Sequence, residues 1–270
     1  MPLRAPLPAL LLALVFASGL GCCRLFQSDE ERYRKALECS ERLTSDKSVE
    51  ILRDGYQCCA PLPETVRDRE AAKRFYLEEA RALKPAAPEP DAAIGLSYWE
   101  GGQFEQALGA YREAARKSSR PFAYRVAVVT MLRLTGRYDE ALAEIASLRR
   151  LRGVDAEKVA DYLQGRVLYE QGRLPEAAVA FQRALAGAEK TGSFLGPSPY
   201  TMQDAWFYTA QIRRKTGDPL GGHEAFKAYL AAMHNPEFQT WYANTLLPRH
   251  GADQAGLYDA IEENWVRERQ

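Results

Sequence analysis

Residues 94–121 read I-G-L-S-Y-W-E-G-G-Q-F-E-Q-A-L-G-A-Y-R-E-A-A-R-K-S-S-R-P, and this stretch decides the fold. Its small and aromatic residues recur at the spacing of two packed helices: Gly95, Tyr98, Phe104, Ala107, Tyr111 and Ala114. The small residues let two antiparallel helices approach closely, and the aromatic ones fill the gaps around them. Gly102 supplies a left-handed turn between the helices at little steric cost. The stretch therefore predicts one helix-turn-helix unit.

The same pattern returns three times along the chain. Gly136 follows Gly102 after 34 residues, Gly172 follows after 36 more, and Gly217 after a further 45. Matching small and large residues surround these glycines: Tyr138, Ala141, Ile145, Leu148, Gly165, Ala177, Phe181, Ala184, Trp206, Ala210, Gly222 and Phe226. A helical period near 34 residues is typical of the tetratricopeptide repeat.

Residues 88–236 therefore resemble the tetratricopeptide repeat family over four repeats. The resemblance implies an all-α fold, a right-handed solenoid of helical hairpins with helical caps at both ends. The alternative is four unrelated helical hairpins. Residues 237–270 are expected to form the C-terminal capping helices, because the last repeat of a solenoid must hide its open end. Residues 189–201 are rich in Gly, Pro and Ser, which predicts an inserted loop before the fourth repeat.

The amino terminus has the pattern of a secretory signal. Arg4 precedes a short apolar run, Leu7–Phe16, which is too short to span a bilayer and is followed by small residues. The signal segment ends at Gly21-Cys22-Cys23, which resembles a bacterial lipoprotein lipobox. The resemblance implies that residues 1–21 are removed, that Cys22 is acylated, and that residues 22–28 tether the fold to the membrane. Acylation of Cys23, or an ordinary secreted protein, are the alternatives.

In the lipoproteins that this segment resembles, sorting depends on the residue after the acylated cysteine. Here that residue is Cys23 or Arg24, and neither is the Asp that retains such proteins in the inner membrane of enteric bacteria. We therefore expect a lipid-anchored protein on the periplasmic side of the outer membrane.

Residues 29–87 are expected to be a helical region with a degenerate repeat. Ser28 to Glu31 forms an S-x-x-E capping-box pattern before the first helix. Further helices are expected over Ser48–Cys59 and Glu64–Leu83, and Ala86–Asp91 is expected to be the turn into the first clear repeat.

Five cysteines raise the question of a disulfide, since an exported chain meets an oxidising compartment. With a turn near Ser45, Cys39 would lie opposite about residue 51, and Cys58 ~10 Å further along the helix axis. A disulfide tolerates a Cα separation of only roughly 7 Å, so we expect Cys23, rather than Cys39, to pair with Cys58 or Cys59. Buried or idle thiols are the alternative.

Composition and motifs favour binding over catalysis. The chain has 36 basic and 36 acidic residues, which gives no basic excess for nucleic acid. It contains no recognisable metal-binding, phosphate-binding or nucleophile motif, so no metal, cofactor or enzymatic activity is expected.

In the tetratricopeptide family, the first helix of each repeat lines a concave groove. Carried over by position, the resemblance implies a partner-binding groove lined by Trp99, Thr130, Arg133, Tyr162, Arg166, Tyr169, Phe207, Gln211 and Arg214. Arginines and aromatics are enriched at binding hot spots, and an arginine fork suits a peptide carboxylate. We expect Arg133, Arg166 and Arg214 to be exposed in one concave surface. The alternative is that large members of the set, such as Tyr162 and Phe207, turn into the core.

The expected partners are envelope proteins or peptides, with the membrane contacted through the lipid anchor; the oligomeric state is left open. Tetratricopeptide lipoproteins of this size resemble pilotins for pilus secretins, outer-membrane assembly subunits and parts of gliding-motility machinery. An adaptor for peptidoglycan hydrolases or synthases is a second reading, and a periplasmic enzyme or small-ligand receptor a third.

Overall fold

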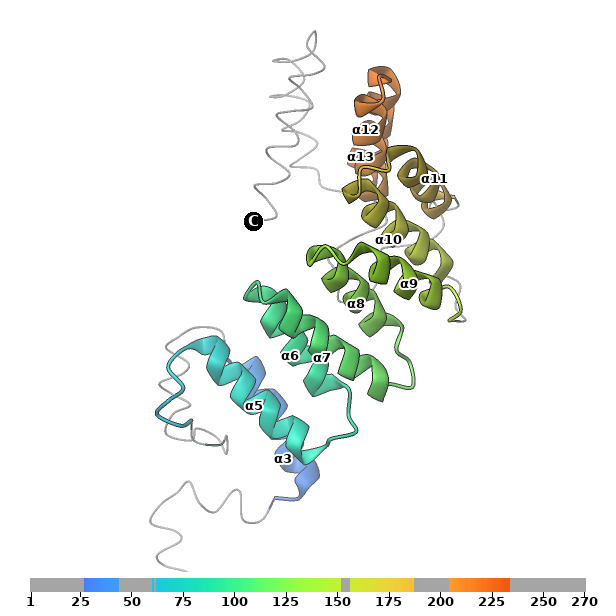
Figure 1. Cartoon of the computed structure of the whole chain (residues 1–270). Helices are drawn as coiled ribbons and strands as arrows, with labels where there is room; N and C mark the ends of the chain where they lie inside the picture. Colours follow the sequence, from blue (N-terminus) through green and yellow to red (C-terminus); the bar gives the residue numbers. More distant parts are fainter. Residues whose placement is uncertain (1–26, 44–59, 61, 152–155, 187–203, 234–270) are drawn as a thin grey trace, which may run out of the picture. The chain divides into compact units, whose positions relative to one another are not determined.

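The computed structural model describes residues 27–43, 60, 62–151, 156–186 and 204–233. Within these residues it has ten α-helices and no strand, which confirms the all-α solenoid of helical hairpins (Figure 1). The chain divides into two compact units, with the boundary after Gly136.

Unit 1 is a row of antiparallel helices in which each helix packs on the next (Figure 1). The α3 helix packs on α5, α5 on α6, α6 on α7, and α7 on α8. Their bounds are α3 Asp29–Glu41, α5 Arg69–Leu83, α6 Glu89–Glu100, α7 Phe104–Lys117 and α8 Phe122–Leu134.

Unit 2 repeats the same local arrangement. The α10 helix packs on α9 and α11, α11 also contacts α12, and α12 forms a hairpin with α13. Their bounds are α9 Tyr138–Leu148, α10 Ala156–Glu170, α11 Leu174–Leu185, α12 Asp204–Lys215 and α13 Pro219–Met233.

The turn glycines have the backbone conformation that the sequence predicts. Gly102, Gly136, Gly172 and Gly217 have φ angles of 70°, 71°, 75° and 86°. A residue with a Cβ atom is strained in this left-handed region, so glycine ends each first helix there. The four turns confirm the repeat phase that was read from the sequence.

Close contact between small and aromatic residues holds each hairpin together. A Cβ atom added at Gly95 would lie 3.1 Å from the Tyr111 ring, and one added at Gly165 would lie 2.7 Å from the Phe181 ring. Ala107 and Ala177, the small residues of the facing helices, are 0% exposed. In these two hairpins an aromatic ring therefore packs directly against the backbone of the facing helix at a glycine.

The first helix begins where the sequence predicts. The Ser28 hydroxyl accepts a hydrogen bond from the Glu31 N–H at 3.2 Å, and the Glu31 carboxylate accepts one from the Ser28 N–H at 2.8 Å. These two bonds complete the capping box. They also lower the pKa of Glu31, because the hydrogen bonds favour its ionised form.

Two later helix starts differ from expectation. The α5 helix begins at Arg69 instead of Glu64, because the Asp68 side chain caps it by accepting a hydrogen bond from the Ala71 N–H at 2.8 Å. The α6 helix begins at Glu89, so the last residues of the expected Ala86–Asp91 turn form its first turn. Proline at the start of a helix is tolerated, since its missing N–H would have no helical partner there.

Cys39 corrects the disulfide expectation. It is 0% exposed and disulfide-bonded, so leaving it out of the pairing was wrong. The expectation assumed that the chain leads straight into a second hairpin helix, whereas Ala60 and Leu62 pack in one hydrophobic cluster with Cys39. The chain therefore returns to the end of α3. The other four cysteines lie outside the described residues, and the pairing of Cys23 with Cys58 or Cys59 stays a prediction.

Several predicted segments lie outside the described residues. They are the signal sequence 1–21, most of the tether, the helix Ser48–Cys59, the loop 189–201 and the capping segment 237–270. Among the helices that are described, none combines the length and apolar character needed to cross a membrane.

Candidate binding faces on the first helices

The first helices of the hairpins are α3, α6 and α8 in unit 1, and α10 and α12 in unit 2. In unit 2 their residues form a connected group, which we call the unit 2 cluster. It consists of Tyr162, Arg166, Tyr169, Tyr208 and Lys215, and it contains three of the nine residues expected to line a groove.

Arg166 is at the centre of the unit 2 cluster. Its Nη1 donates a hydrogen bond to the Tyr162 hydroxyl at 3.2 Å, and its Nη2 lies 3.5 Å from a Glu170 oxygen. Its guanidinium carbon lies 4.4 Å from the centroid of the Tyr208 ring, a distance at which a cation is attracted to the ring face. Residues of α10 and α12 therefore hold the Arg166 side chain within the protein itself.

The expectation that Arg133 and Arg166 are exposed was wrong. Each is only 6% exposed. For Arg166 the reason is Tyr208, which comes from the neighbouring first helix and covers the guanidinium. Arg214, the third predicted arginine, is partly buried at the end of α12. Truncation of Arg166 should therefore lower stability as well as change any binding.

Tyr162 and Phe207 turn inward, as in the alternative reading. Each is 3% exposed. Tyr162 lies 6.1 Å from Phe181, and Phe207 lies 5.7 Å from Tyr229, measured between ring centroids. Burial raises the pKa of Tyr162, because the ionised phenolate would be poorly solvated there. These two aromatics are core residues, and so is Gln211, which is 1% exposed.

The other end of the unit 2 cluster reaches solvent. Lys215 is exposed, and its Nζ donates a hydrogen bond to the Tyr169 hydroxyl at 2.8 Å. The same Nζ lies 4.8 Å from the Tyr169 ring centroid. Tyr169 is partly exposed and packs edge-on against Tyr208 at 5.1 Å. Tyr169 and Lys215 are thus the part of the unit 2 cluster that a partner can contact.

In unit 1 the predicted residues separate. Thr130 is 4% exposed, and its hydroxyl donates to the Val126 carbonyl at 3.0 Å within its own helix. Trp99 is partly exposed near the end of α6. Of the predicted unit 1 residues, Trp99 is the one that offers contact area to a partner.

A second group in unit 1 was missed by the sequence analysis. Tyr33 of α3 contacts Glu89 of α6, and the charge of the Glu89 carboxylate also acts on Tyr124 of α8. The Tyr33 hydroxyl donates to the Glu89 carboxylate across a long 3.5 Å contact. Burial first, and then the Glu89 carboxylate, raise the pKa of both tyrosines. We call Tyr33, Glu89, Leu96, Trp99 and Tyr124 the unit 1 face.

One signal could have revealed Glu89. Counted from residue 88, where the first clear repeat begins, Glu89 holds the second place of its repeat, which the family resemblance assigns to the groove. The turn expected over Ala86–Asp91 includes this residue. Tyr33 and Tyr124 carry no comparable sequence signal, since their approach to Glu89 depends on how three helices pack.

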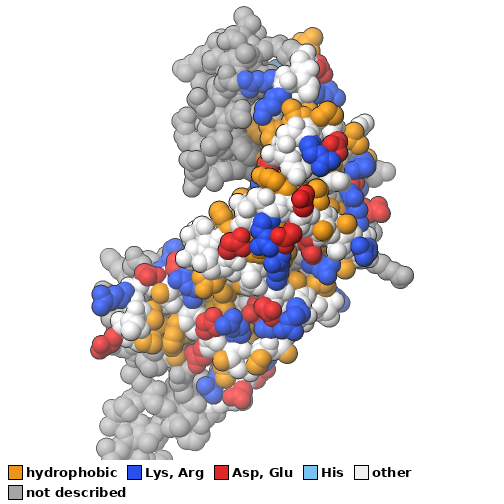
Figure 2. All heavy atoms as spheres, in the orientation of Figure 1, with side chains coloured by type: hydrophobic (Ala, Val, Ile, Leu, Met, Phe, Trp, Pro, Cys, Tyr) orange, Lys and Arg blue, Asp and Glu red, His pale blue; other side chains and the backbone are white. Residues whose placement is uncertain are grey.

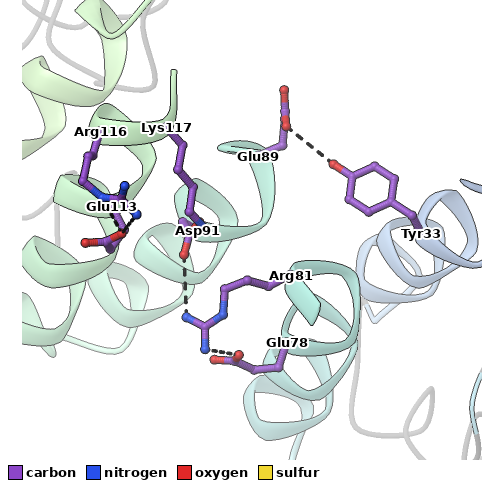
Figure 3. Close-up of polar contacts among 8 residues, drawn as sticks. All are labelled: Tyr33, Glu78, Arg81, Glu89, Asp91, Glu113, Arg116 and Lys117. Atoms are coloured by element: carbon purple, nitrogen blue, oxygen red, sulfur yellow. Dashed lines mark hydrogen bonds and ion pairs between the residues drawn. The ribbon is translucent and has the colours of Figure 1, made fainter. Parts of the chain in front are cut away.

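The first turn of α6 is fixed by a buried carboxylate (Figure 3). Asp91 is 1% exposed and forms an ion pair with Lys117 of α7, and Arg81 Nη1 of α5 lies 3.6 Å from its other oxygen. Arg81 also pairs with Glu78. Two bases from the flanking helices thus hold the turn that carries Glu89.

The described surface carries both signs of charge. Figure 2 shows Lys and Arg side chains interspersed with Asp and Glu over the coloured residues of both units, in keeping with the 36 bases and 36 acids of the chain. Among the described residues, no group of three or more His, Cys, Asp or Glu side chains is placed to hold a metal ion.

Comparison with known proteins agrees with this architecture. A family model described as "Tetratricopeptide repeat" matches residues 92–156 and 135–193. No curated protein matches the sequence significantly.

Solved structures share the fold at low sequence identity. Pseudomonas aeruginosa PilF is 12% identical and has a TM-score of 0.55, covering 88% of this chain and all of its own. MamA of Desulfovibrio magneticus RS-1 is 15% identical, with a TM-score of 0.51, over 75% of this chain and 96% of its own. The Cut9-Hcn1 complex of APC/C contains a chain that is 18% identical, with a TM-score of 0.52, over 88% of this chain and 44% of its own. At these identities the likeness shows the fold alone.

Proposed function

Because the chain carries tetratricopeptide repeats, whose domains bind peptides or proteins, we propose that it is a non-enzymatic scaffold. It binds other proteins through the first helices of its hairpins, at the unit 1 face and at the Tyr169–Lys215 end of the unit 2 cluster. Tetratricopeptide proteins are generally scaffolds of this kind.

The observation that carries the proposal is the contact between Tyr33 and Glu89, which joins two successive first helices at one surface. The Glu89 carboxylate also interacts electrostatically with Tyr124 of the next first helix. Beside them, α6 leaves Leu96 and Trp99 partly exposed. Aromatic side chains beside a defined polar group are typical of protein-binding surfaces.

The proposed setting is the periplasmic side of the bacterial outer membrane. The lipobox-like Gly21-Cys22-Cys23 supports lipid anchoring at Cys22. The disulfide at Cys39 supports an oxidising compartment, since structural disulfides are rare in the cytosol. A bacterial lipoprotein carries several acyl chains, which would hold it stably where one chain would anchor it only marginally.

Within that setting, we favour a role in assembling an envelope machine. The sequence resemblance to tetratricopeptide lipoproteins that act as pilotins makes a pilus secretin the first machine to test. Outer-membrane protein assembly and gliding-motility machinery are the other members of this group. An adaptor for peptidoglycan hydrolases or synthases is the second candidate, and it is supported by the same binding surface.

A pull-down from detergent-solubilised membranes tests the scaffold role. We expect wild type to retain envelope proteins, and the double variant Trp99→Ala, Tyr169→Ala to lose them, because both residues offer accessible ring surface. Glu113→Ala is the control, since Glu113 is exposed on the second helix α7. Undiminished capture by the double variant would contradict the proposed faces. Wall enzymes among the captured proteins would favour the second candidate.

The anchor is tested separately by Cys22→Ser. This variant should lose the acylated residue and fractionate with the soluble periplasm, while wild type fractionates with the outer membrane. Immunoblots of membrane and soluble fractions, with a detergent phase-partition assay, measure the change. Unaltered membrane association would contradict acylation at Cys22.

A further inference from the structure

We propose that the unit 1 face binds a basic segment of a partner protein, with a Lys or Arg side chain against the Glu89 carboxylate. This inference rests on the proposed scaffold function, and it names the chemical class of partner that one of the two surfaces takes. Among the residues of unit 1 that the structure describes, no Lys or Arg forms an ion pair with Glu89.

The Glu89 carboxylate has hydrogen-bonding capacity that the protein itself leaves open. Glu89 is exposed, and its contact with the Tyr33 hydroxyl is 3.5 Å long, so most of its hydrogen-bonding capacity remains open. Among the described residues, no Lys or Arg nitrogen forms an ion pair with it. A carboxylate in this condition can accept further charge-assisted hydrogen bonds.

The lysines Lys84 and Lys73 of unit 1 pair with acids other than Glu89. Lys84 pairs with Glu30, and its Nζ also lies 4.3 Å from the Tyr33 ring centroid. Lys73 pairs with Glu100 at 3.3 Å, at the other end of α6. Lys84 and Lys73 therefore each have an acid of their own, and neither of them pairs with Glu89.

The unit 1 face also carries tyrosine side chains. Tyr33 contacts the carboxylate, and burial together with the Glu89 charge raises the pKa of both Tyr33 and Tyr124 above the ordinary tyrosine value. The position of Lys84 over Tyr33 shows that this ring accepts a cation at its face.

Apolar side chains continue the unit 1 face along α6. Leu96 lies two turns after Glu89 on α6, and Trp99 lies one turn further. Both are partly exposed. A partner segment could therefore place a basic residue at Glu89 and apolar residues along the following turns of the helix.

The first turn of α6, which carries Glu89, is held in place by ion pairs. The buried ion pairs of Asp91 with Lys117 and Arg81 hold the first turn of α6 against α5 and α7 (Figure 3). Glu89 lies two residues before Asp91, so its backbone is fixed before binding. Less backbone freedom is therefore lost when Glu89 captures a cation.

The unit 2 cluster offers a contrast that makes the inference specific. There, Lys215 already contacts the Tyr169 hydroxyl and ring, and Arg166 is held by Tyr162 and Tyr208. The unit 2 cluster thus already contains its cations, Lys215 and Arg166. The unit 1 face would take its cation from a partner. A basic segment should therefore discriminate between the two surfaces.

The test is binding of a fluorescein-labelled 12-residue peptide of Lys, Arg, Leu and Gly to the detergent-purified protein, followed by fluorescence anisotropy. A peptide with Glu in place of every Lys and Arg is the second probe. We expect wild type to bind the basic probe and not the acidic one, with affinity that falls as salt is raised. Glu89→Gln should weaken binding by about tenfold, and Glu113→Gln should leave it unchanged.

Melting curves accompany these measurements. Glu89→Gln should melt like wild type, because the side chain is exposed and makes one long contact. Equal binding of the basic probe by Glu89→Gln and wild type would overturn the inference, as would equal binding of the acidic probe by wild type.

The outcomes also separate this inference from the scaffold proposal. If wild type captures envelope proteins but ignores the basic probe, the scaffold proposal stands and the basic class is wrong. If the basic probe binds in a Glu89-dependent manner but no envelope protein is captured, the unit 1 site stands and the envelope role is wrong.

Discussion

At the scale of single residues, some features could be predicted from the sequence and others could not. The turn glycines were predictable, because a positive φ angle is an intrinsic demand that glycine meets at little cost. Arg166 was not, because its burial depends on Tyr208 of another helix. A residue's own backbone requirement can be read from the chain, whereas the cover supplied by a neighbour depends on tertiary packing.

Gly165 provides a test of the close approach between α10 and α11. Gly165→Ala should destabilise the protein by about 1–3 kcal/mol, since the new methyl group would meet the Phe181 ring at 2.7 Å. Gly109→Ala is the matched control, because nothing lies within 4 Å of its added Cβ atom on α7. This change should stabilise by about 0.5–1 kcal/mol. Thermal melting measures both, and equal shifts would contradict the packing described.

Cys39 provides a second test at this scale. Alkylation without reductant, followed by peptide mapping, should leave Cys39 unlabelled and recover it in a disulfide-linked peptide. The linked peptide identifies the partner among the four other cysteines, and it also shows whether Cys23 pairs with Cys58 or Cys59. Full labelling of Cys39 would contradict the disulfide.

At the scale of helices, the repeat phase was predicted well and the helix starts less well. The second helices α7, α9 and α11 bury Ala107, Ala141 and Ala177 at 0% exposure, at the places that the period predicts. The starts of α5 and α6 were missed by a few residues. The side-chain cap of Asp68 sets the start of α5. The α6 helix begins inside a proline-containing segment that reads as a turn, because proline is tolerated in the first turn of a helix.

The α11 helix allows a matched comparison of its two sides. Ala177→Leu should destabilise by roughly 1–3 kcal/mol, because Ala177 is fully buried and the helices leave no room for added methylenes. Val179→Leu should change stability by less than about 0.5 kcal/mol, since Val179 is 52% exposed on the same helix. Urea titration of both variants gives the comparison, and similar midpoints would show that the assigned sides of α11 are wrong.

At the scale of the whole molecule, the fold class followed from the sequence and the binding surface only in part. The period of glycines and alanines was enough to predict a tetratricopeptide solenoid. Among the residues that the position rule assigned to the groove, Trp99 and Tyr169 are partly exposed, whereas Thr130, Tyr162 and Phe207 are buried. A position in a repeat specifies a helix side, while exposure depends on the size of the side chains around it.

The central claim is that first helices, and not second helices, contact the partner proteins. Photo-crosslinking in living cells tests it most directly. A photoreactive amino acid replaces Leu96 or Tyr169 on first helices, and Glu113 or Val179 on the exposed sides of second helices. Crosslinked envelope proteins at Leu96 and Tyr169, with none at Glu113 and Val179, are the predicted result. Crosslinks confined to Glu113 and Val179 would contradict the account.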